Sequence, residues 1–440
     1  MTSLSLTEKP PFERSRWPLL ALQLGLFFSL FGINPTGGIG GEGSVLRQGG
    51  WVALALMCLL SASASPEHWA RLKHSLRHMR TAIALLVVFW LFALASTMWA
   101  EAPLVTFKRA ILLGIVLLIC TLAAATLHAS RTQLADVVIT PLVALLVLSV
   151  IFSAAFPRIA FTDIGWQGIT GQKNSMGQLA AILILALLHG SRATRKAWLW
   201  VGVGLAAALA ALALSRSSTA MVSLLAAASV VLALRLRGWV RGNPGWAIAL
   251  YFLFLLMATV VFIAYLGDWL PSLEKARATF FGALGKSENL TGRTKLWDLV
   301  MAQHPYRSEI VGGGYGGFWD ISHERILYIV SRLGFQPIQA HNGYLDVFND
   351  LGYVGLAILC LVFAYHAYCL ATRSKAAADS LHFHFALGTY FFLANFSEST
   401  VFRTTQFLNL LFIVSLLLVA AKRRGEHDLR LRPQAVAPAR

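Results

Sequence analysis

Long apolar segments alternate with short polar ones along almost the whole chain. Stretches of about 18 or more apolar residues are typical of transmembrane helices. The pattern therefore predicts an all-α, polytopic membrane protein with about twelve transmembrane helices. The first, sixth and eleventh are short enough for one of them to be re-entrant. The predicted spans are residues 17–33, 45–64, 82–99, 105–127, 134–156, 174–190, 197–214, 217–234, 246–267, 350–370, 381–396 and 403–421.

One long polar interruption, roughly residues 268–349, separates two of these spans. Loops of this length are uncommon unless they have a function. "PSLEKARATFFGAL" and "GRTKLWDLVMAQH" predict two short helices within it, the second ending at His304-Pro305. "GGGYGG" at 312–317 cannot form a regular helix and predicts a flexible turn. We expect a compact, partly helical cap within a single integral membrane domain that covers residues 1–440.

The composition agrees with this interpretation. Hydrophobic residues make up 57% of the chain and charged residues only 13%, which differs from a typical soluble domain in both respects. The polar N-terminal segment leads into a full-length span, so no cleavable signal peptide is expected. All four cysteines fall in apolar segments without metal-ligand spacing, and we expect small core residues there rather than ligands or disulfides.

The net charge of +17 could suggest a nucleic-acid partner, but basic residues of membrane proteins collect in cytoplasmic loops. With the N-terminus in the cytoplasm, the short loops 65–81, 191–196 and 235–245 are basic and lie inside. Both termini are then cytoplasmic, the loop 268–349 faces outward, and residues 422–440 form a basic tail near anionic lipid. No nucleic-acid partner is expected.

Several basic residues oppose this bias, because they lie at the predicted outer border. For Arg47 and Arg158, snorkelling to lipid headgroups is an equally good interpretation. Lys173 in "ITGQKNSMG" and Arg216 in the tight turn "LALSRSSTAM" are expected to face the bundle and to need an anionic partner. The border cations outside the long loop are Arg47, Lys108, Arg109, Arg158, Lys173, Arg216 and Arg403.

The long loop adds Arg293 and Lys295 in "LTGRTKLW", and acidic residues on this side are fewer. Such unpaired positive charge predicts a membrane-anchored phosphate or diphosphate, whose oxygens suit the planar fork of arginine. His341, in "HNGYLDVFNDLG", lies at the same border. It can be interpreted as a base for group transfer from a phosphorylated lipid carrier, or as a residue that caps or buttresses the next helix.

Four segments, in this order, resemble the bacterial O-antigen ligase/polymerase family: "ITGQKNSMGQLAA", "LALSRSSTAM", "LTGRTKLWDLVMAQHPYRSEIVGGGYGGFW" and "AHNGYLDVFNDLGYVGL". The resemblance covers most of residues 80–420. Within the family, "TGR…W", "GYGGFW" and "FSEST" are most similar to exopolysaccharide polymerases. The resemblance implies a GT-C-like, inverting glycosyltransferase of the bacterial inner membrane, without a metal or other cofactor. It would use an undecaprenyl-diphosphate-linked glycan donor at the periplasmic face.

Carried over residue by residue, the resemblance assigns Arg216 and Arg293 to the donor diphosphate and His341 to the acceptor hydroxyl. Further candidates lie beside these motifs. We expect supporting substrate contacts from Lys173, Asn174, Lys295 and Asn342, and Asp346 and Glu398 are the next candidates for the base.

Three functions remain in competition. The first is polymerisation of lipid-linked repeat units into exopolysaccharide or O-antigen, with a flippase and a chain-length regulator as implied partners. The second is ligation of finished glycan to a lipid A core acceptor. The third is a flippase or transporter, which should carry polar residues through the depth of its spans. The spans look free of polar residues inside, and polar residues gather at the outer face, which favours catalysis. The sugar, the linkage, the polymer and the oligomeric state stay open.

Overall fold

The computed structural model describes residues 14–32, 45–190, 195–239, 293–303, 308–320, 324–372 and 378–421. Most of these residues are helical, which confirms the all-α membrane class. A two-stranded antiparallel hairpin pairs β1 (Phe161–Thr162) with β2 (Gly165–Trp166).

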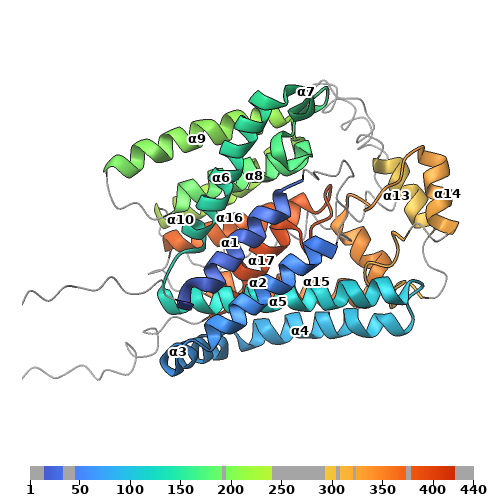
Figure 1. Cartoon of the computed structure of the whole chain (residues 1–440), viewed down its shortest axis with the longest axis horizontal. Helices are drawn as coiled ribbons and strands as arrows, with labels where there is room; N and C mark the ends of the chain where they lie inside the picture. Colours follow the sequence, from blue (N-terminus) through green and yellow to red (C-terminus); the bar gives the residue numbers. More distant parts are fainter. Residues whose placement is uncertain are drawn as a thin grey trace, which may run out of the picture.

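The helices pack side by side as a bundle, with two shorter helices at one end (Figure 1). The N-terminal half contains α1 Trp17–Leu30, α2 Val45–Ala62, α3 Pro66–His78, α4 Arg80–Ala95, α5 Pro103–Ser130, α6 Leu134–Ala155 and α7 Pro157–Ala160. The remainder contains α8 Lys173–His189, α9 Arg195–Ser215, α10 Ser218–Trp239, α13 Arg293–Ala302, α14 Glu324–Leu333, α15 Gly343–Thr372, α16 Ala378–Ala394 and α17 Phe407–Ala420.

The expected count of about twelve spans is not confirmed. Within the described residues, six helices are long and apolar enough to cross a membrane, or seven if α2 and α3, bent by 111°, form one span. The predicted spans 17–33, 174–190, 381–396 and 403–421 correspond to α1, α8, α16 and α17, which have 14 or 17 residues each and are too short to count among these six. Span 246–267 and the tail 422–440 lie outside the described residues.

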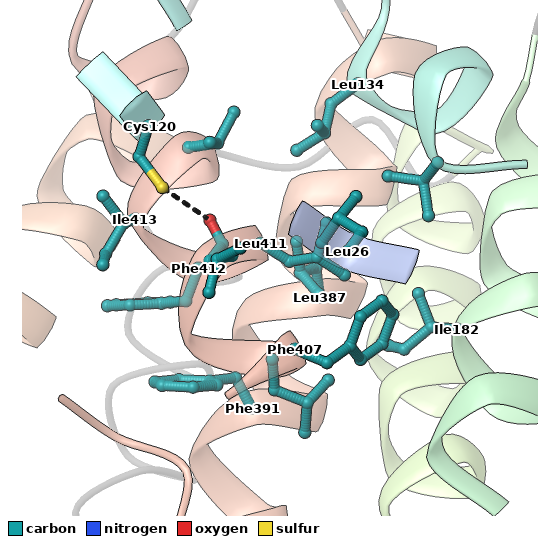
Figure 2. Close-up of a cluster of buried hydrophobic side chains, with 14 of the residues drawn as sticks. Leu26, Cys120, Leu134, Ile182, Leu387, Phe391, Phe407, Leu411, Phe412 and Ile413 are labelled. Atoms are coloured by element: carbon teal, nitrogen blue, oxygen red, sulfur yellow. Dashed lines mark hydrogen bonds between the residues drawn. The ribbon is translucent and has the colours of Figure 1, made fainter. Parts of the chain in front are cut away.

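Helix α17 explains why short helices occur here. Its 14 residues extend only about 21 Å, less than the roughly 30 Å of a bilayer core. All but two of them are buried, because α17 is surrounded by other helices and does not need to match the bilayer alone. Figure 2 shows this centre, where the rings of Phe391 and Phe412 stack 4.3 Å apart.

The cysteines follow the prediction in part. Cys58, Cys120 and Cys369 are buried, and the Cys120 thiol lies 3.9 Å from the Leu410 carbonyl oxygen (Figure 2). Cys360 is exposed on α15, so its prediction as a core residue is wrong. An outward position on a membrane helix can be as apolar as a core position, and periodicity does not separate the two here.

The two ends of the bundle carry different loops. The long-loop end carries α13 and α14, and the basic-loop end carries residues 65–81 and 128–133 (Figure 1). Helix α5 runs from one end to the other. The amide of Glu101, just before α5, donates to Gly313 of the long loop, and α5 ends at Ser130. Its 28 residues span about 42 Å.

Residues 312–317 form turns and no regular helix, as predicted, but these turns are packed inside the protein. These residues are buried, and the amides of Gly313 and Gly314 donate to the carbonyls of Asn349 and Asp350, both at 2.9 Å. A Cβ on Gly314 would lie 2.3 Å from the Ala100 side chain. The glycines therefore allow the loop backbone to pack directly against the membrane helices.

Helix α15 contains two helical parts. Gly352 has φ 61° and ψ −159°, which separates a short first part from the membrane-crossing part. The amides of Tyr353 and Val354, released by the kink, donate to the carbonyls of Glu309 and Ile310 at 2.9 and 3.0 Å. Helix α15 therefore begins at Gly343, before the predicted span 350–370, but its membrane-crossing part begins after Gly352, close to the predicted start.

The long loop is partly helical, as predicted. Helix α13 lies within "GRTKLWDLVMAQH", whereas α14 was not predicted. Leu296 and Trp297 of α13 share a small apolar cluster with Ile326 and Ile329 of α14. "PSLEKARATFFGAL" and His304-Pro305 lie outside the described residues.

Candidate functional site

The segment between α16 and α17 is irregular and mostly buried. The sequence predicted a helix from residue 403, but α17 begins at Phe407. Asn395 Oδ1 accepts hydrogen bonds from the amides of Thr400 and Val401, and Asn409 Oδ1 accepts one from Phe402. Side-chain amides thus satisfy the non-helical backbone, which at membrane depth is tolerated only inside protein or around a cavity.

Glu398, in this irregular segment, is the centre of the candidate site. Its Oε1 accepts from Arg293 Nη2 and from Asn174 Nδ2, both at 2.7 Å. Its Oε2 lies 3.7 Å from His341 Nδ1. The Glu398 side chain is 7% exposed and that of Arg293 is 13% exposed. The structure therefore brings Arg293, His341 and Asn174 together around a carboxylate that the sequence named only as a reserve candidate.

Helix N-termini position these groups. Arg293 is the first residue of α13, and Asn174 lies in the first turn of α8. Ser217, just before α10, donates from Oγ to Asn174 Oδ1 at 3.1 Å. His341 lies two residues before α15. A helix N-terminus carries partial positive charge, so four of them near Glu398 favour an anion there.

Arg216 and Lys173 lie directly beside this cluster, because their chain neighbours Ser217 and Asn174 form part of it. Both reach the turn between β1 and β2. Arg216 Nη1 donates to the Asp163 carbonyl and Lys173 Nζ to the Ile164 carbonyl, each at 3.3 Å. A hydrogen bond of this length to an exposed turn leaves Arg216 able to turn to a stronger anionic partner.

Two candidate catalytic residues have left-handed backbone conformations. Arg216 has φ 50° and His341 has φ 51°. Such φ values are uncommon for residues other than glycine and cost about 1–2 kcal/mol. Strained backbone of this kind clusters at functional sites. Both strained residues adjoin the Glu398 cluster, because Arg216 precedes Ser217 in the chain and His341 faces Glu398.

The segment that carries His341 is held by further polar contacts. Gln339 Nε2 lies 3.2 Å from His341 Nδ1, and Gln339 Oε1 accepts from Arg403 Nη1 at 2.8 Å. Arg403 Nη2 also donates to the Ile338 carbonyl at 3.0 Å. Arg403, predicted only as a border cation, therefore positions the loop before His341.

Asp346 also holds the segment before His341 through hydrogen bonds. Its Oδ1 accepts from Trp319 Nε1 at 2.9 Å and from the Ala340 amide at 3.1 Å, and its Oδ2 lies 3.8 Å from Arg403 Nη1. Trp319 ends the motif "GYGGFW", and Gln339 lies two residues before His341, but neither was named as a site residue. Their partners Asp346 and Arg403 lie 27 and 64 positions away, separations that periodicity does not reveal.

The structure places the remaining predicted residues around this cluster. Asn342 is buried, and its Oδ1 accepts from the amides of Tyr344 and Leu345, so it caps α15. The capping role considered for His341 therefore belongs to Asn342. Lys295 Nζ donates to the Arg332 carbonyl at 2.9 Å and ties α13 to α14. Substrate contacts of Asn342 and Lys295 stay predictions.

A metal centre is not formed by the described side chains. Within the described ranges, no three His, Cys, Asp or Glu residues are arranged to hold an ion.

Comparison with known proteins gives two matches. Residues 203–360 match a family model described as O-Antigen ligase, a range that includes Arg216, Arg293 and His341 but ends before Glu398. The Exopolysaccharide production protein ExoQ of Rhizobium meliloti (strain 1021) is 37% identical over 87 residues, which is 18% of this chain and 19% of that protein. The chain thus matches about a fifth of the length of this relative. Together the two matches confirm the resemblance to the bacterial O-antigen ligase/polymerase family that the motifs indicated.

Proposed function

We propose that the protein is an inner-membrane glycosyltransferase that polymerises glycan repeat units from an undecaprenyl-diphosphate-linked donor at the periplasmic face. The observation that supports this best is the meeting of His341 with Arg293 around Glu398. A candidate base and a candidate diphosphate ligand thereby lie in one cluster, with Arg216 and Lys173 beside it.

In the proposed reaction, the acceptor hydroxyl gives its proton to His341. Its oxygen attacks the anomeric carbon of the donor sugar while the bond from that carbon to the diphosphate oxygen breaks. Arg216 and Arg293 hold the departing diphosphate, whose charge grows as the bond breaks. A single displacement inverts the anomeric configuration. The arginines take the role that a metal ion has in other glycosyl transfers, so the proposed reaction is metal-independent.

Glu398 has two tasks in this proposal. Its distance of 3.7 Å from His341 Nδ1 is too long for a hydrogen bond, but catalytic contacts are often long before substrate binds. Once His341 carries the proton, the negative charge of the nearby carboxylate stabilises the imidazolium. Glu398 also competes with the donor for Arg293, so donor binding requires Arg293 to exchange a carboxylate for a phosphate.

The alternative within the same chemistry is ligation, in which a lipid A core replaces the growing glycan as acceptor. The name of the family model favours ligation, and the name of the relative, a protein of exopolysaccharide production, favours polymerisation. The flippase alternative is less favoured, because the candidate donor ligands and the candidate base meet at one end of the bundle.

The test uses purified full-length protein in liposomes with a lipid-linked repeat-unit donor. With donor alone, polymerisation predicts a ladder of products that each differ by one repeat. If product forms only when a lipid A core is added, the ligase alternative is correct. If labelled donor crosses the membrane without forming a glycosidic bond, the proposal of an enzyme is wrong.

A further inference from the structure

A cavity of about 720 Å³ lies at the basic-loop end of the bundle. Its walls come from α3, from the α5–α6 connection and from the start of α16. Ligand pockets in proteins have volumes of about 300–1,000 Å³. His384 of α16 lines the cavity, and the ten residues from His384 to Ala394, near the candidate site, extend about 15 Å along the helix. The cavity is therefore not part of the candidate site around Glu398.

The polar wall of the cavity is cationic. Arg71 of α3 and Arg131 of the α5–α6 connection line it, together with His74, His128 and His384. No Asp or Glu occurs among the described residues that line it. The rest of the wall is largely alanine, leucine and phenylalanine. A ligand that suits both walls is an anion attached to an apolar body.

Arg131 lies in an unfavourable backbone conformation. It is the residue that ends α5, with φ 57° and ψ 22°. Helices commonly end with a left-handed residue, but that residue is usually glycine, which has no Cβ to strain. Arg131 therefore places its guanidinium at the cavity although its backbone conformation lowers the stability of the fold. This cost suggests that the charge has a function.

Helix α3 places the cavity at the depth of lipid headgroups. It is bent by 111° from α2 and lies at the basic-loop end of the bundle, so it does not continue the α2 span (Figure 1). Leu72 and Ser75 are buried on its inner face, while Trp69 is 46% exposed. Amphipathic helices in this orientation lie in the membrane interface, where tryptophan is enriched.

Polar groups also continue from the cavity into the bundle. His384, 8% exposed, lines the cavity, and its Nδ1 lies 2.8 Å from Ser415 Oγ. His366 Nε2 lies 3.2 Å from the same oxygen. The sequence indicated spans free of polar residues inside, and the structure corrects this at the basic-loop end. Ionisable side chains at membrane depth usually mark a ligand site or a pathway.

We propose that this cavity binds the phosphate headgroup of an anionic phospholipid. The Arg71 and Arg131 guanidinium groups contact the phosphate oxygens, and the apolar wall packs against the glycerol and the first part of the acyl chains. The basic loops place this end in the cytoplasm, where anionic headgroups attract basic segments. A phospholipid also supplies both the anion and the apolar body, which a free phosphate does not.

The experiment compares lipid binding by full-length protein in an uncharged detergent, measured by native mass spectrometry. Phosphatidylglycerol and phosphatidylcholine with the same acyl chains are the probes. The cavity variant is Arg71→Gln/Arg131→Gly. The matched control is Lys73→Gln/Arg77→Gln, which removes two cations from exposed positions of α3 that do not line the cavity. If the cavity variant unfolds, Arg131→Gly alone is used, since glycine suits the backbone at that position.

We expect wild-type protein and the control to bind phosphatidylglycerol in preference to phosphatidylcholine. The cavity variant should lose at least about tenfold of its phosphatidylglycerol affinity, because hydrogen bonds to charged groups are lost. An equal loss in both variants would mean attraction by general surface charge and would overturn the proposal. Displacement of the lipid by millimolar inorganic phosphate would mean that the cavity takes free phosphate instead.

Discussion

The Arg293 guanidinium forms an ion pair with Glu398 at 2.7 Å, although the two residues are 105 positions apart in the chain. Arg293 begins a helix of the long loop, whereas Glu398 belongs to the buried break between α16 and α17. The pair therefore fastens the long loop to the membrane bundle where His341 also lies. Removing one partner of a pair this buried typically costs about 3–5 kcal/mol of folding stability. The cluster therefore stabilises the fold in addition to its proposed role in catalysis.

Glu398→Gln is expected to separate donor binding from catalysis. The amide removes the charge but keeps the shape and an oxygen that accepts from Arg293, so the long loop stays attached by a neutral hydrogen bond. Without a competing carboxylate, Arg293 is available to the donor diphosphate, so KM for donor should fall. The imidazolium of His341 loses its carboxylate, so kcat should fall by about a hundredfold. Steady-state kinetics with the lipid-linked donor measure both constants.

The matched control for this variant is Glu101→Gln. Glu101 pairs with Arg325 on the same side of the molecule but outside the Glu398 cluster. Both constants should stay within about threefold, because partly exposed ion pairs contribute little. A Glu398→Gln enzyme with unchanged kcat would show that Glu398 acts only as a competitor of the donor.

Arg216→Lys is expected to damage transfer although it keeps the charge. Lysine presents a point charge, and only the guanidinium fork can contact two phosphate oxygens at once. We expect at least about a tenfold loss in kcat/KM for donor. Arg47→Lys is the control, since Arg47 donates to the Phe31 carbonyl and is not part of the cluster. Equal activity of wild type and Arg216→Lys would exclude bidentate recognition at this position.

Gly352→Ala should destabilise the fold strongly. The new Cβ would lie 2.5 Å from the backbone of Glu309 and Ile310, at φ 61°. A loss of about 2–4 kcal/mol is expected from the clash and the strained backbone. Gly202→Ala in α9 should instead stabilise by about 0.5–1 kcal/mol, since that Cβ meets nothing within 4 Å. Thermal unfolding in detergent measures both, and equal shifts would contradict the kink at Gly352.

Much of the site was predictable from local sequence, because its residues carry distinctive types at distinctive places. Arg216 and His341 were found from charge and from motif order, and "GRTKLW" correctly indicated a helix. The organising role of Glu398 was not predictable. A lone glutamate in "FSEST" gives no periodic signal, and its partners come from distant parts of the chain.

The all-α membrane class was predictable from the sequence, but the number of membrane-crossing helices was not. Apolar runs mark helices, yet they do not distinguish a helix that crosses lipid from one enclosed by other helices, as α17 is. Glycine-rich sequence is also ambiguous, because it occurs both in mobile turns and in tightly packed ones. "GGGYGG" is typical of a mobile turn, but Gly314 is required for close packing against Ala100.

His341→Gly gives the sharpest test of the proposed base. Glycine fits the φ of 51° at this position, so the variant should be as stable as wild type or more stable by up to about 1 kcal/mol. Transfer should fall by about a hundred- to ten-thousandfold, the usual contribution of a general base. His341→Ala should lose the same activity without the gain in stability, because alanine keeps the strain. Arg131→Gly, at φ 57°, shows in thermal unfolding how large that gain in stability is.

Retention of more than about a tenth of the wild-type rate by His341→Gly would place the base elsewhere, since a true base contributes more. Asp346 is then a poor substitute, because both of its carboxylate oxygens already accept hydrogen bonds, from Trp319 and Ala340. Glu398 would become the strongest remaining candidate, and Glu398→Gln kinetics in the His341→Gly background would decide it. If His341→Gly lowers the unfolding temperature together with activity, His341 supports the loop before α15, and the assignment of a base fails.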